Sequence, residues 1–301
     1  MGGPTPSTAV ETRATALVDS EKQLFDSEYR RFFVDGETKP KHVGEPYLLE
    51  NAGATSGVLL VHGLMAAPEE VREWAEYLFA RGYTVYAPRM AGHGTSAADL
   101  SRRSAREWID SVDRGYAILK SRCDRIVAAG FSTGGAVVLH RVIENPQAFE
   151  AVISISAPLA FRKFSARFAG ALSLWNQTLA AAGVKRFRKE FVPNDADNPQ
   201  INYLRCPVRS IAQVQRLMRE VYRGLASVSI PALVIHAKDD PKVDVRSGRD
   251  IHRRLGASTK RYCEIDFDQH GIVRGQVAAR VFAEVGEFLQ QCVPAASGVS
   301  R

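Results

Sequence analysis

Cysteine is scarce in this chain of 301 residues, which contains only Cys123, Cys206, Cys263 and Cys292. The four are far apart and form neither a C-x-x-C pair nor a Cys/His cluster, so the sequence offers no zinc site. Scattered thiols of this kind are typical of reduced cysteines in the cytosol rather than of a disulfide framework. We therefore expect a cytoplasmic protein without a bound metal ion.

Long hydrophobic runs are also missing. No stretch of about 18 apolar residues occurs, so we expect no transmembrane helix. The N-terminal region has no basic segment followed by an apolar one, so we expect no secretory signal. Internal repeats and low-complexity tracts are absent as well. With 45% hydrophobic and 24% charged residues, the composition is that of a globular chain with one large core.

Acidic residues are few in one segment. Between residues 158 and 228 there are twelve Arg or Lys and four Asp or Glu, a difference of +8, whereas the whole chain carries +7. No RNP, zinc-finger or basic-zipper pattern accompanies this charge, so nucleic-acid binding is not indicated. A solvated, Arg-rich helical face explains it. The alternative is a weak attraction to an anionic membrane surface or an acidic substrate.

Apolar strand patterns alternate with amphipathic helix patterns along most of the chain. Strand patterns cover residues 45–50, 57–62, 83–88, 125–130, 150–156, 231–237 and 260–266. Helical patterns cover residues 68–82, 104–122, 134–145, 244–256 and 276–292. Because the strands are continuous apolar runs, the alternation predicts an α/β protein with a parallel sheet covered by helices on both faces.

Two segments depart from this alternation. Residues 1–40 are polar, and we expect a loose N-terminal extension with one helix through Leu24–Phe25 and Phe32–Phe33. Residues 159–227 contain two amphipathic helix patterns, 164–183 and 210–225, and no strand–helix–strand rhythm. We interpret residues 159–227 as a helical insertion over a core formed by residues 41–158 and 228–295.

The stretch "GFSTGG" lies between a strand pattern and a helix pattern, and it places Ser132 in a G-x-S-x-G motif. A chance match is not rare, at about one in ten chains of this length, but a strand-to-helix turn is the context that defines a nucleophile elbow. Side chains at Gly130 and Gly134 would collide where strand and helix approach. The alternative is a helix-capping serine in a glycine turn.

A serine hydroxyl needs a base, and the partners of an elbow serine follow it as an acid and then a histidine. Asp239 and Asp240 come after the strand at 231–237, and His270 comes after the last strand. Five other histidines precede the elbow or fall inside helices and strands, so we interpret them as structural or surface residues: His62, His93, His140, His236 and His252.

The elbow mechanism also needs two backbone N–H groups that hold the oxyanion. Thr133, directly after the serine, supplies one. The loop at His62–Met65 follows an earlier strand, and the Leu64 N–H is the second candidate. Gly63 allows a close backbone approach, and we expect His62 to be a buried residue that holds the loop by hydrogen bonds.

Five stretches, "LLVHGL", "RGYTVYAPRMAGHGTS", "GFSTGG", "HAKDDPKV" and "QHGI", resemble the α/β-hydrolase superfamily in their order and spacing. They are most similar to bacterial carboxylesterases and monoacylglycerol lipases, over about residues 46–292. The resemblance implies an α/β-hydrolase fold with a helical cap, no cofactor, and a catalytic triad of Ser132, Asp240 and His270, with Asp239 as the fallback acid. It also implies that Gly92–His93–Gly94 shapes a loop.

Two residues depart from the family pattern and bear on the shape of the pocket. Thr133 is β-branched where an unbranched residue is common, and Gly271 follows His270 where a larger residue is usual. The resemblance places the helical cap in the insertion, where an apolar face could line an acyl pocket or only pack the cap onto the core. The expected substrate-binding residues are Met65, Phe164, Phe168 and Trp175.

We therefore predict a serine hydrolase that cleaves a small carboxylic ester or an acyl lipid through an acyl-enzyme. Other chemistries on the same triad are a lactonase, thioesterase, peptidase, acyltransferase or C–C bond hydrolase. A non-catalytic, ligand-binding relative is a further alternative, although such proteins usually lack part of the triad. The sequence leaves the acyl length, the alcohol and the oligomeric state open.

Overall fold

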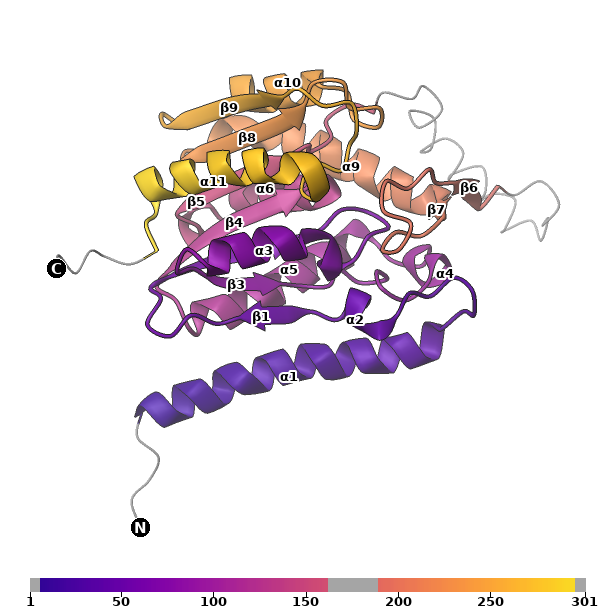
Figure 1. Cartoon of the computed structure of the whole chain (residues 1–301), viewed down its shortest axis with the longest axis horizontal. Helices are drawn as coiled ribbons and strands as arrows, with labels where there is room; N and C mark the ends of the chain where they lie inside the picture. The colour runs from indigo at the N-terminus through magenta and orange to yellow at the C-terminus, as the bar shows by residue number, and fades with distance from the viewer. Residues whose placement is uncertain (1–5, 162–188, 296–301) are drawn as a thin grey trace, which may run out of the picture.

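The computed structural model describes residues 6–161 and 189–295, and a central sheet of seven strands lies at its middle (Figure 1). The strand order is β1-β3-β2-β4-β5-β8-β9, and only β1 runs antiparallel to its neighbour. The bounds are β1 (Tyr47–Leu49), β2 (Ser56–Val61), β3 (Thr84–Ala87), β4 (Arg125–Phe131), β5 (Ala151–Ile155), β8 (Ala232–Ala237) and β9 (Lys260–Ile265).

Helices cover both faces of this sheet (Figure 1). On one face lie α3 (Arg72–Phe79) and α11 (Ala278–Cys292). On the other lie α5 (Ala105–Lys120), α6 (Thr133–Glu144), α9 (Val208–Gly224) and α10 (Arg246–Arg254). Short helical turns in the connections are α2 (Lys41–Gly44), η1 (Pro68–Val71), α4 (Ala97–Leu100), η2 (Pro146–Ala148), η3 (Leu225–Ser227) and η4 (Gly275–Val277).

The sheet separates two hydrophobic cores. Along β2, Val58 and Leu60 belong to the core under α3 and α11, whereas Leu59 and Val61 belong to the core under α5 and α6. All four side chains are fully buried. Burial on both faces explains why the strands appear in the sequence as continuous apolar runs rather than as alternating patterns.

The order of the strands determines where a ligand can bind. After β2 the chain crosses to β3 on one side, and it later returns to β4 on the other side of β2. The loops that leave the carboxyl ends of β2 and β4 therefore diverge and form a crevice between them, which is the usual ligand site of such sheets. The predicted oxyanion loop, residues 62–65, and Ser132 both lie at this crevice.

The insertion between β5 and β8 is helical only in part. The predicted helix at 210–225 is present as α9, whereas the predicted helix at 164–183 lies outside the described residues. The insertion also contains a short antiparallel pair that the sequence did not predict, formed by β6 (Phe191–Pro193) and β7 (Arg205–Pro207). Strands of three residues are too short for an alternating pattern to show in the sequence. The division of the chain into extension, core and insertion stays a prediction.

The N-terminal extension contains the helix that the sequence predicted through Leu24–Phe25, but it is docked on the core rather than loose. It forms one helix, α1 (Pro6–Phe32), which lies along the side of the molecule near β1 and packs against α5 (Figure 1). Phe25 of this helix is fully buried, and Glu21 is 8% exposed and bound to Arg114. The docking could not be predicted from the sequence, because two of the groups that hold α1 in place, Glu21 and Glu28, are charged. Their partners lie far away in the sequence.

No helix among the described residues is long and apolar enough to cross a membrane. The four cysteines are free thiols. In residues 6–161 and 189–295, no group of three or more His, Cys, Asp or Glu side chains is arranged to hold a metal ion.

Candidate active site

Ser132 lies at the turn between β4 and α6. Its φ angle is 52°, in the left-handed region, and its N–H donates to the Ile155 carbonyl of β5 at 2.8 Å. A Cβ atom at Gly130 would lie 2.4 Å from the Gly134 carbonyl carbon, and one at Gly134 would lie 2.2 Å from the Val61 oxygen. Side chains cannot approach backbone so closely, which confirms that both glycines serve the close approach of strand and helix.

Ser132, His270 and Asp240 come together beyond the carboxyl ends of β4, β9 and β8. With its proton on Nδ1, His270 donates to Asp240 Oδ2 at 2.6 Å, and its Nε2 accepts the Ser132 hydroxyl at 2.8 Å. Asp240 is 1% exposed and His270 is 7% exposed. The His270 ring also packs against Phe131, with 5.0 Å between centroids. A hydroxyl bound to a base that is itself held by a carboxylate can act as a nucleophile.

The two aspartates after β8 have different surroundings. Asp239 is exposed, whereas Asp240 binds His270 and accepts the backbone N–H groups of Lys242 and Val243 at 2.8 and 2.9 Å. Burial by itself raises the pKa of the Asp240 carboxyl, but these hydrogen bonds outweigh it and hold its pKa below the usual value. Asp240 is therefore ionised at neutral pH and fixed beside His270.

Three of the histidines that we interpreted as structural or surface residues contact other side chains of the fold. His236, on β8, is fully buried, and burial lowers its pKa to about 4, so it is a neutral neighbour 3.7 Å from Asp240 Oδ2. His140 on α6 contacts Glu220 of α9, and His252 on α10 stacks on a tyrosine ring. His270 is therefore the histidine that reaches Ser132.

The loop after β2 brings Leu64 to the cavity that Ser132 lines. His62 is fully buried, and burial lowers its pKa to about 4, so its ring is neutral. Its Nδ1–H donates to the Gly63 carbonyl at 2.9 Å, and its Nε2 accepts the Met90 N–H at 3.2 Å. The Gly63 carbonyl and the Leu64 N–H belong to one planar peptide group and point in opposite directions. Holding the carbonyl therefore also sets the direction of the Leu64 N–H.

Thr133 lines the same cavity as the first residue of α6. N–H groups in the first turn of a helix have no acceptor within the helix, and they carry the positive end of its dipole. Leu64 and Thr133 thus bring two backbone N–H groups close to Ser132, as stabilisation of an oxyanion requires. Their role as oxyanion donors stays a prediction.

Tyr203 of the insertion is a supporting residue that sequence reasoning missed. Its N–H donates to the Met65 carbonyl at 2.9 Å. Its buried hydroxyl accepts the Thr95 N–H at 2.8 Å and donates to the Gly92 carbonyl at 3.0 Å. One tyrosine thus ties the oxyanion loop to the loop that the sequence identified by Gly92–His93–Gly94. No local pattern around Tyr203 could have indicated contacts with residues more than 100 positions away.

Ser132 and His270 line a cavity of about 430 Å³, which is within the range of small-molecule sites. The apolar residues that line it include Leu64, Met65, Phe131, Phe161, Val192, Val208 and Ile211. The polar ones include Glu70, Asn194, Asp195, Asp197, Asn198 and Asn202. Among the predicted substrate-binding residues, Met65 lines the cavity, whereas Phe164, Phe168 and Trp175 lie outside the described residues.

Glu70, in η1, is a second buried acid at this cavity and was not predicted. It is 5% exposed, and its Oε2 accepts the Gly63 N–H at 2.7 Å. A Cβ atom at Gly63 would lie 3.0 Å from this oxygen and 3.3 Å from Ser132 Cβ, so the loop passes closely between the two side chains. Burial raises the pKa of Glu70 to about 7, although the Gly63 hydrogen bond and the charge of His270 lower it.

We expect Glu70→Gln to change how folding stability depends on pH. The pKa of Glu70 is about 7 in the folded protein, above the usual value of about 4.3 in the unfolded chain. The folded state therefore binds the proton more tightly, and the wild type loses stability as pH rises from about 4.5 through 7. Glutamine stays neutral. The free energy of unfolding of the variant, relative to that of the wild type, should therefore rise by about 3 kcal/mol between pH 4.5 and pH 8.

Urea unfolding of both proteins at pH 4.5, 6 and 8 measures this difference. Stability curves that run parallel across the range would contradict a buried Glu70 with a raised pKa. The change at each pH is read as a difference between the two proteins, so titration of the other groups cancels in the comparison.

Asp197 of the insertion contacts both loops that carry the partners of Ser132. Its Oδ2 accepts the Gly271 N–H at 2.9 Å, directly after His270. Its Oδ1 accepts Lys242 Nζ at 2.9 Å, two residues after Asp240. The insertion is thus bonded to the histidine loop and to the aspartate loop, and Asp197 is a second supporting residue without a local signal in the sequence.

The mostly parallel sheet, the serine at the turn after β4, and the acid and histidine after β8 and β9 define an α/β-hydrolase. Residues 53–276 match the family described as serine aminopeptidase, S33. The chain belongs to this family. The fold class and the resemblance predicted from the sequence are confirmed.

Two characterised bacterial enzymes are similar to this chain. The thermostable monoacylglycerol lipase of Bacillus sp. (strain H-257) is 30% identical over 229 residues, which cover 75% of this chain and 86% of that protein. The carboxylesterase of Bacillus subtilis (strain 168) is 26% identical over 240 residues, covering 79% and 94%. A solved structure of the metagenome-derived lipolytic enzymes LipS and LipT shares the fold, with a TM-score of 0.73 and 23% identity over 83% of this chain and 98% of that one.

Proposed function

We propose that this protein hydrolyses carboxylic esters of a small polar alcohol, with monoacylglycerols as the substrate type, through an acyl-enzyme on Ser132. The observation that carries the proposal is the continuous hydrogen-bonded series from Ser132 Oγ through His270 to Asp240. It lies at a cavity that Leu64 and Thr133 also line. The carboxylesterase and monoacylglycerol lipase relatives support the choice of an ester bond.

In the first half of the reaction, Ser132 Oγ attacks the ester carbonyl carbon and its proton passes to His270 Nε2. The Leu64 and Thr133 N–H groups hold the negative oxygen of the tetrahedral intermediate. The intermediate collapses, the bond to the alcohol oxygen breaks, and His270 gives its proton to the leaving alcohol. Asp240 stabilises the charged imidazole during these steps.

In the second half, His270 Nε2 takes a proton from a water molecule, whose oxygen attacks the acyl carbon. The second tetrahedral intermediate breaks the bond to Ser132 Oγ, and His270 returns the proton to the serine. The products are the alcohol and a carboxylic acid, and the enzyme is restored. None of these reaction steps uses a metal ion or an organic cofactor.

The mixed lining of the cavity supports the substrate type. Its apolar residues, such as Met65, Phe161 and Ile211, suit an acyl chain. Its polar residues, such as Glu70, Asn198 and Asn202, suit the hydroxyl groups of a polyol such as glycerol. A volume of about 430 Å³ is within the range of cavities that bind small molecules. Weak attraction to anionic lipid surfaces is consistent with the exposed arginines of α9, which are Arg209, Arg216, Arg219 and Arg223. A cytoplasmic location stays a prediction.

A substrate panel tests the proposal. We expect p-nitrophenyl esters from acetyl to palmitoyl to be cleaved with a preference among chain lengths, and monoacylglycerols to be cleaved with a higher kcat/KM than diacylglycerols. The panel includes a lactone, an acyl thioester and an aminoacyl p-nitroanilide. A larger kcat/KM for any of these three would replace ester hydrolysis by lactonase, thioesterase or peptidase activity. Failure of a fluorophosphonate probe to label Ser132 would favour a non-catalytic binding protein.

A further inference from the structure

The N-terminal segment, residues 6–40, lies before the family match at residues 53–276. Its helix α1 does not pack loosely. Phe25 is fully buried, and a Cβ atom at Gly44 would lie 2.7 Å from its ring and 2.8 Å from Gly94 Cα. The helix is therefore seated directly over the connection that follows β3, where Gly94 lies.

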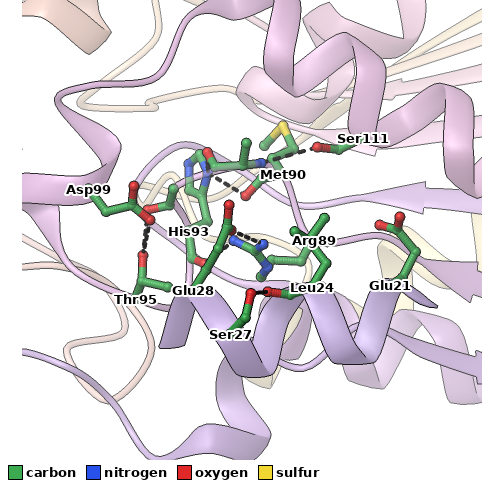
Figure 2. A network of polar contacts seen from close by, with 12 residues as sticks. Glu21, Leu24, Ser27, Glu28, Arg89, Met90, His93, Thr95, Asp99 and Ser111 are labelled. Atoms are coloured by element: carbon green, nitrogen blue, oxygen red, sulfur yellow. Dashed lines mark hydrogen bonds and ion pairs between the residues drawn. The ribbon is translucent and has the colours of Figure 1, made fainter. Parts of the chain in front are cut away.

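Glu28 of α1 is the main polar contact with that connection. Figure 2 shows its carboxylate directed at the guanidinium of Arg89, which follows β3. Arg89 is only 4% exposed, and its other terminal nitrogen donates to the His93 carbonyl at 3.1 Å. The second oxygen of Glu28 accepts Arg103 Nη2 at 2.9 Å. A buried guanidinium needs such a carboxylate, because an unpaired buried charge is strongly destabilising.

The segment that Arg89 holds is in direct contact with the oxyanion loop. Met90, the next residue, donates its N–H to His62 Nε2 at 3.2 Å. The His93 ring meets the His62 ring edge-on, with 5.0 Å between centroids. His62 in turn fixes the Gly63 carbonyl and with it the direction of the Leu64 N–H. A displacement of residues 89–93 therefore shifts a proposed oxyanion donor.

A second connection starts from Glu37, five residues after α1 ends. Its Oε1 accepts the Ala97 N–H at 2.6 Å, and its Oε2 accepts Arg205 Nε at 2.8 Å. Arg205 lies in β7, two residues after Tyr203, whose N–H holds the Met65 carbonyl. The N-terminal segment thus bonds to the connection after β3 and to the insertion, and each of these contacts the oxyanion loop.

We propose that residues 21–37, through Glu28 and Glu37, position the oxyanion loop and so stabilise the transition state rather than bind the substrate. The proposal rests on the proposed function, because it takes the Leu64 N–H as an oxyanion donor. The N-terminal segment is then part of the catalytic unit of this chain, although it touches no reacting atom. Its two glutamates are positioning residues.

Kinetics of Glu28→Gln in the full chain test this role. Loss of one oxyanion donor lowers turnover by about 10²–10³, so a displaced donor should lower kcat by about tenfold. KM should change by less than about twofold, because an interaction that strengthens only in the transition state acts on kcat. A trifluoromethyl ketone analogue of the substrate, which forms an oxyanion on Ser132, should bind about tenfold more weakly by the same reasoning.

The matched control lies on the same helix. Asp26 pairs with Lys41 at 2.8 Å, and the two side chains are 36% and 50% exposed, so Asp26→Asn removes an α1 ion pair that does not reach Arg89. We expect its kcat and its inhibitor affinity to equal those of the wild type. If Asp26→Asn lowers kcat as much as Glu28→Gln does, α1 acts only by general stabilisation and the proposal is wrong.

Glu37→Gln is the second variant, in case Glu28→Gln does not fold. Arg205 is 42% exposed at its side chain, so this change leaves no buried unpaired charge. We expect kcat and ketone affinity to fall together by a few-fold, with KM unchanged. Wild-type values in both glutamate variants would overturn the proposal. The proposed function is tested separately, by the substrate panel and the fluorophosphonate probe on the wild type and by the loss of activity in Ser132→Ala.

Discussion

We expect ester turnover to fall by about 10⁴–10⁶ in the Ser132→Ala variant, while the variant remains folded. The change removes only the hydroxyl that His270 Nε2 accepts at 2.8 Å. Ser132 has a φ angle of 52°, and alanine also carries a Cβ atom, so the backbone strain of the turn is the same in both proteins. Initial rates on a p-nitrophenyl ester and thermal unfolding of both proteins measure the two parts of the prediction.

Ser156 provides a matched control for this experiment. It also has a left-handed backbone, with φ at 49°, it is fully buried, and its N–H donates to the Ile235 carbonyl at 2.8 Å. It follows β5, the strand next to that of Ser132, and it does not line the cavity of about 430 Å³. We expect Ser156→Ala to keep wild-type turnover. More than about 1% of wild-type turnover in Ser132→Ala would exclude the acyl-enzyme on Ser132.

The part of the site that the sequence predicts best is the part that local backbone geometry dictates. Gly130 and Gly134 are required because strand β4 and helix α6 touch, and that requirement is visible as a strand pattern, a G-x-S-x-G motif and a helix pattern in succession. His270 could be selected by its position after the last strand. The choice of Asp240 over Asp239 needed the family resemblance, because both residues follow the same strand.

The groups that hold the oxyanion loop could not be predicted in this way. Glu70 lies in a stretch with a helical pattern, where a glutamate next to another glutamate indicates a solvated face. Tertiary packing buries it against Gly63 instead. Tyr203 and Glu28 act on residues 61 to 138 positions away, and such pairings leave no periodicity in the sequence. Local patterns predict the helices, the strands and the loops that contain the catalytic residues. The contacts that hold these loops in position form only in the folded chain.

Turnover falls by about 10⁴ in the Asp240→Asn variant, the other large effect that we expect. The reason lies in the two oxygens of the carboxylate. Oδ1 accepts the N–H groups of Lys242 and Val243, whereas Oδ2 accepts His270 Nδ1–H. In the variant, the amide oxygen must stay at the two backbone donors, so the NH₂ group faces His270. The imidazole then accepts at Nδ1 and keeps its proton on Nε2, where it cannot take the proton of Ser132.

Asp239→Asn is the matched control, since Asp239 precedes Asp240 in the chain but is exposed. We expect its turnover to stay within about twofold of the wild type, because surface substitutions of this kind change little. The reverse result, with turnover lost in Asp239→Asn and kept in Asp240→Asn, would assign the acid to Asp239. Crystal structures of both variants would show whether His270 stays in place. If it does, the loss of activity in Asp240→Asn comes from the position of one proton, because the geometry of Ser132 and His270 is unchanged.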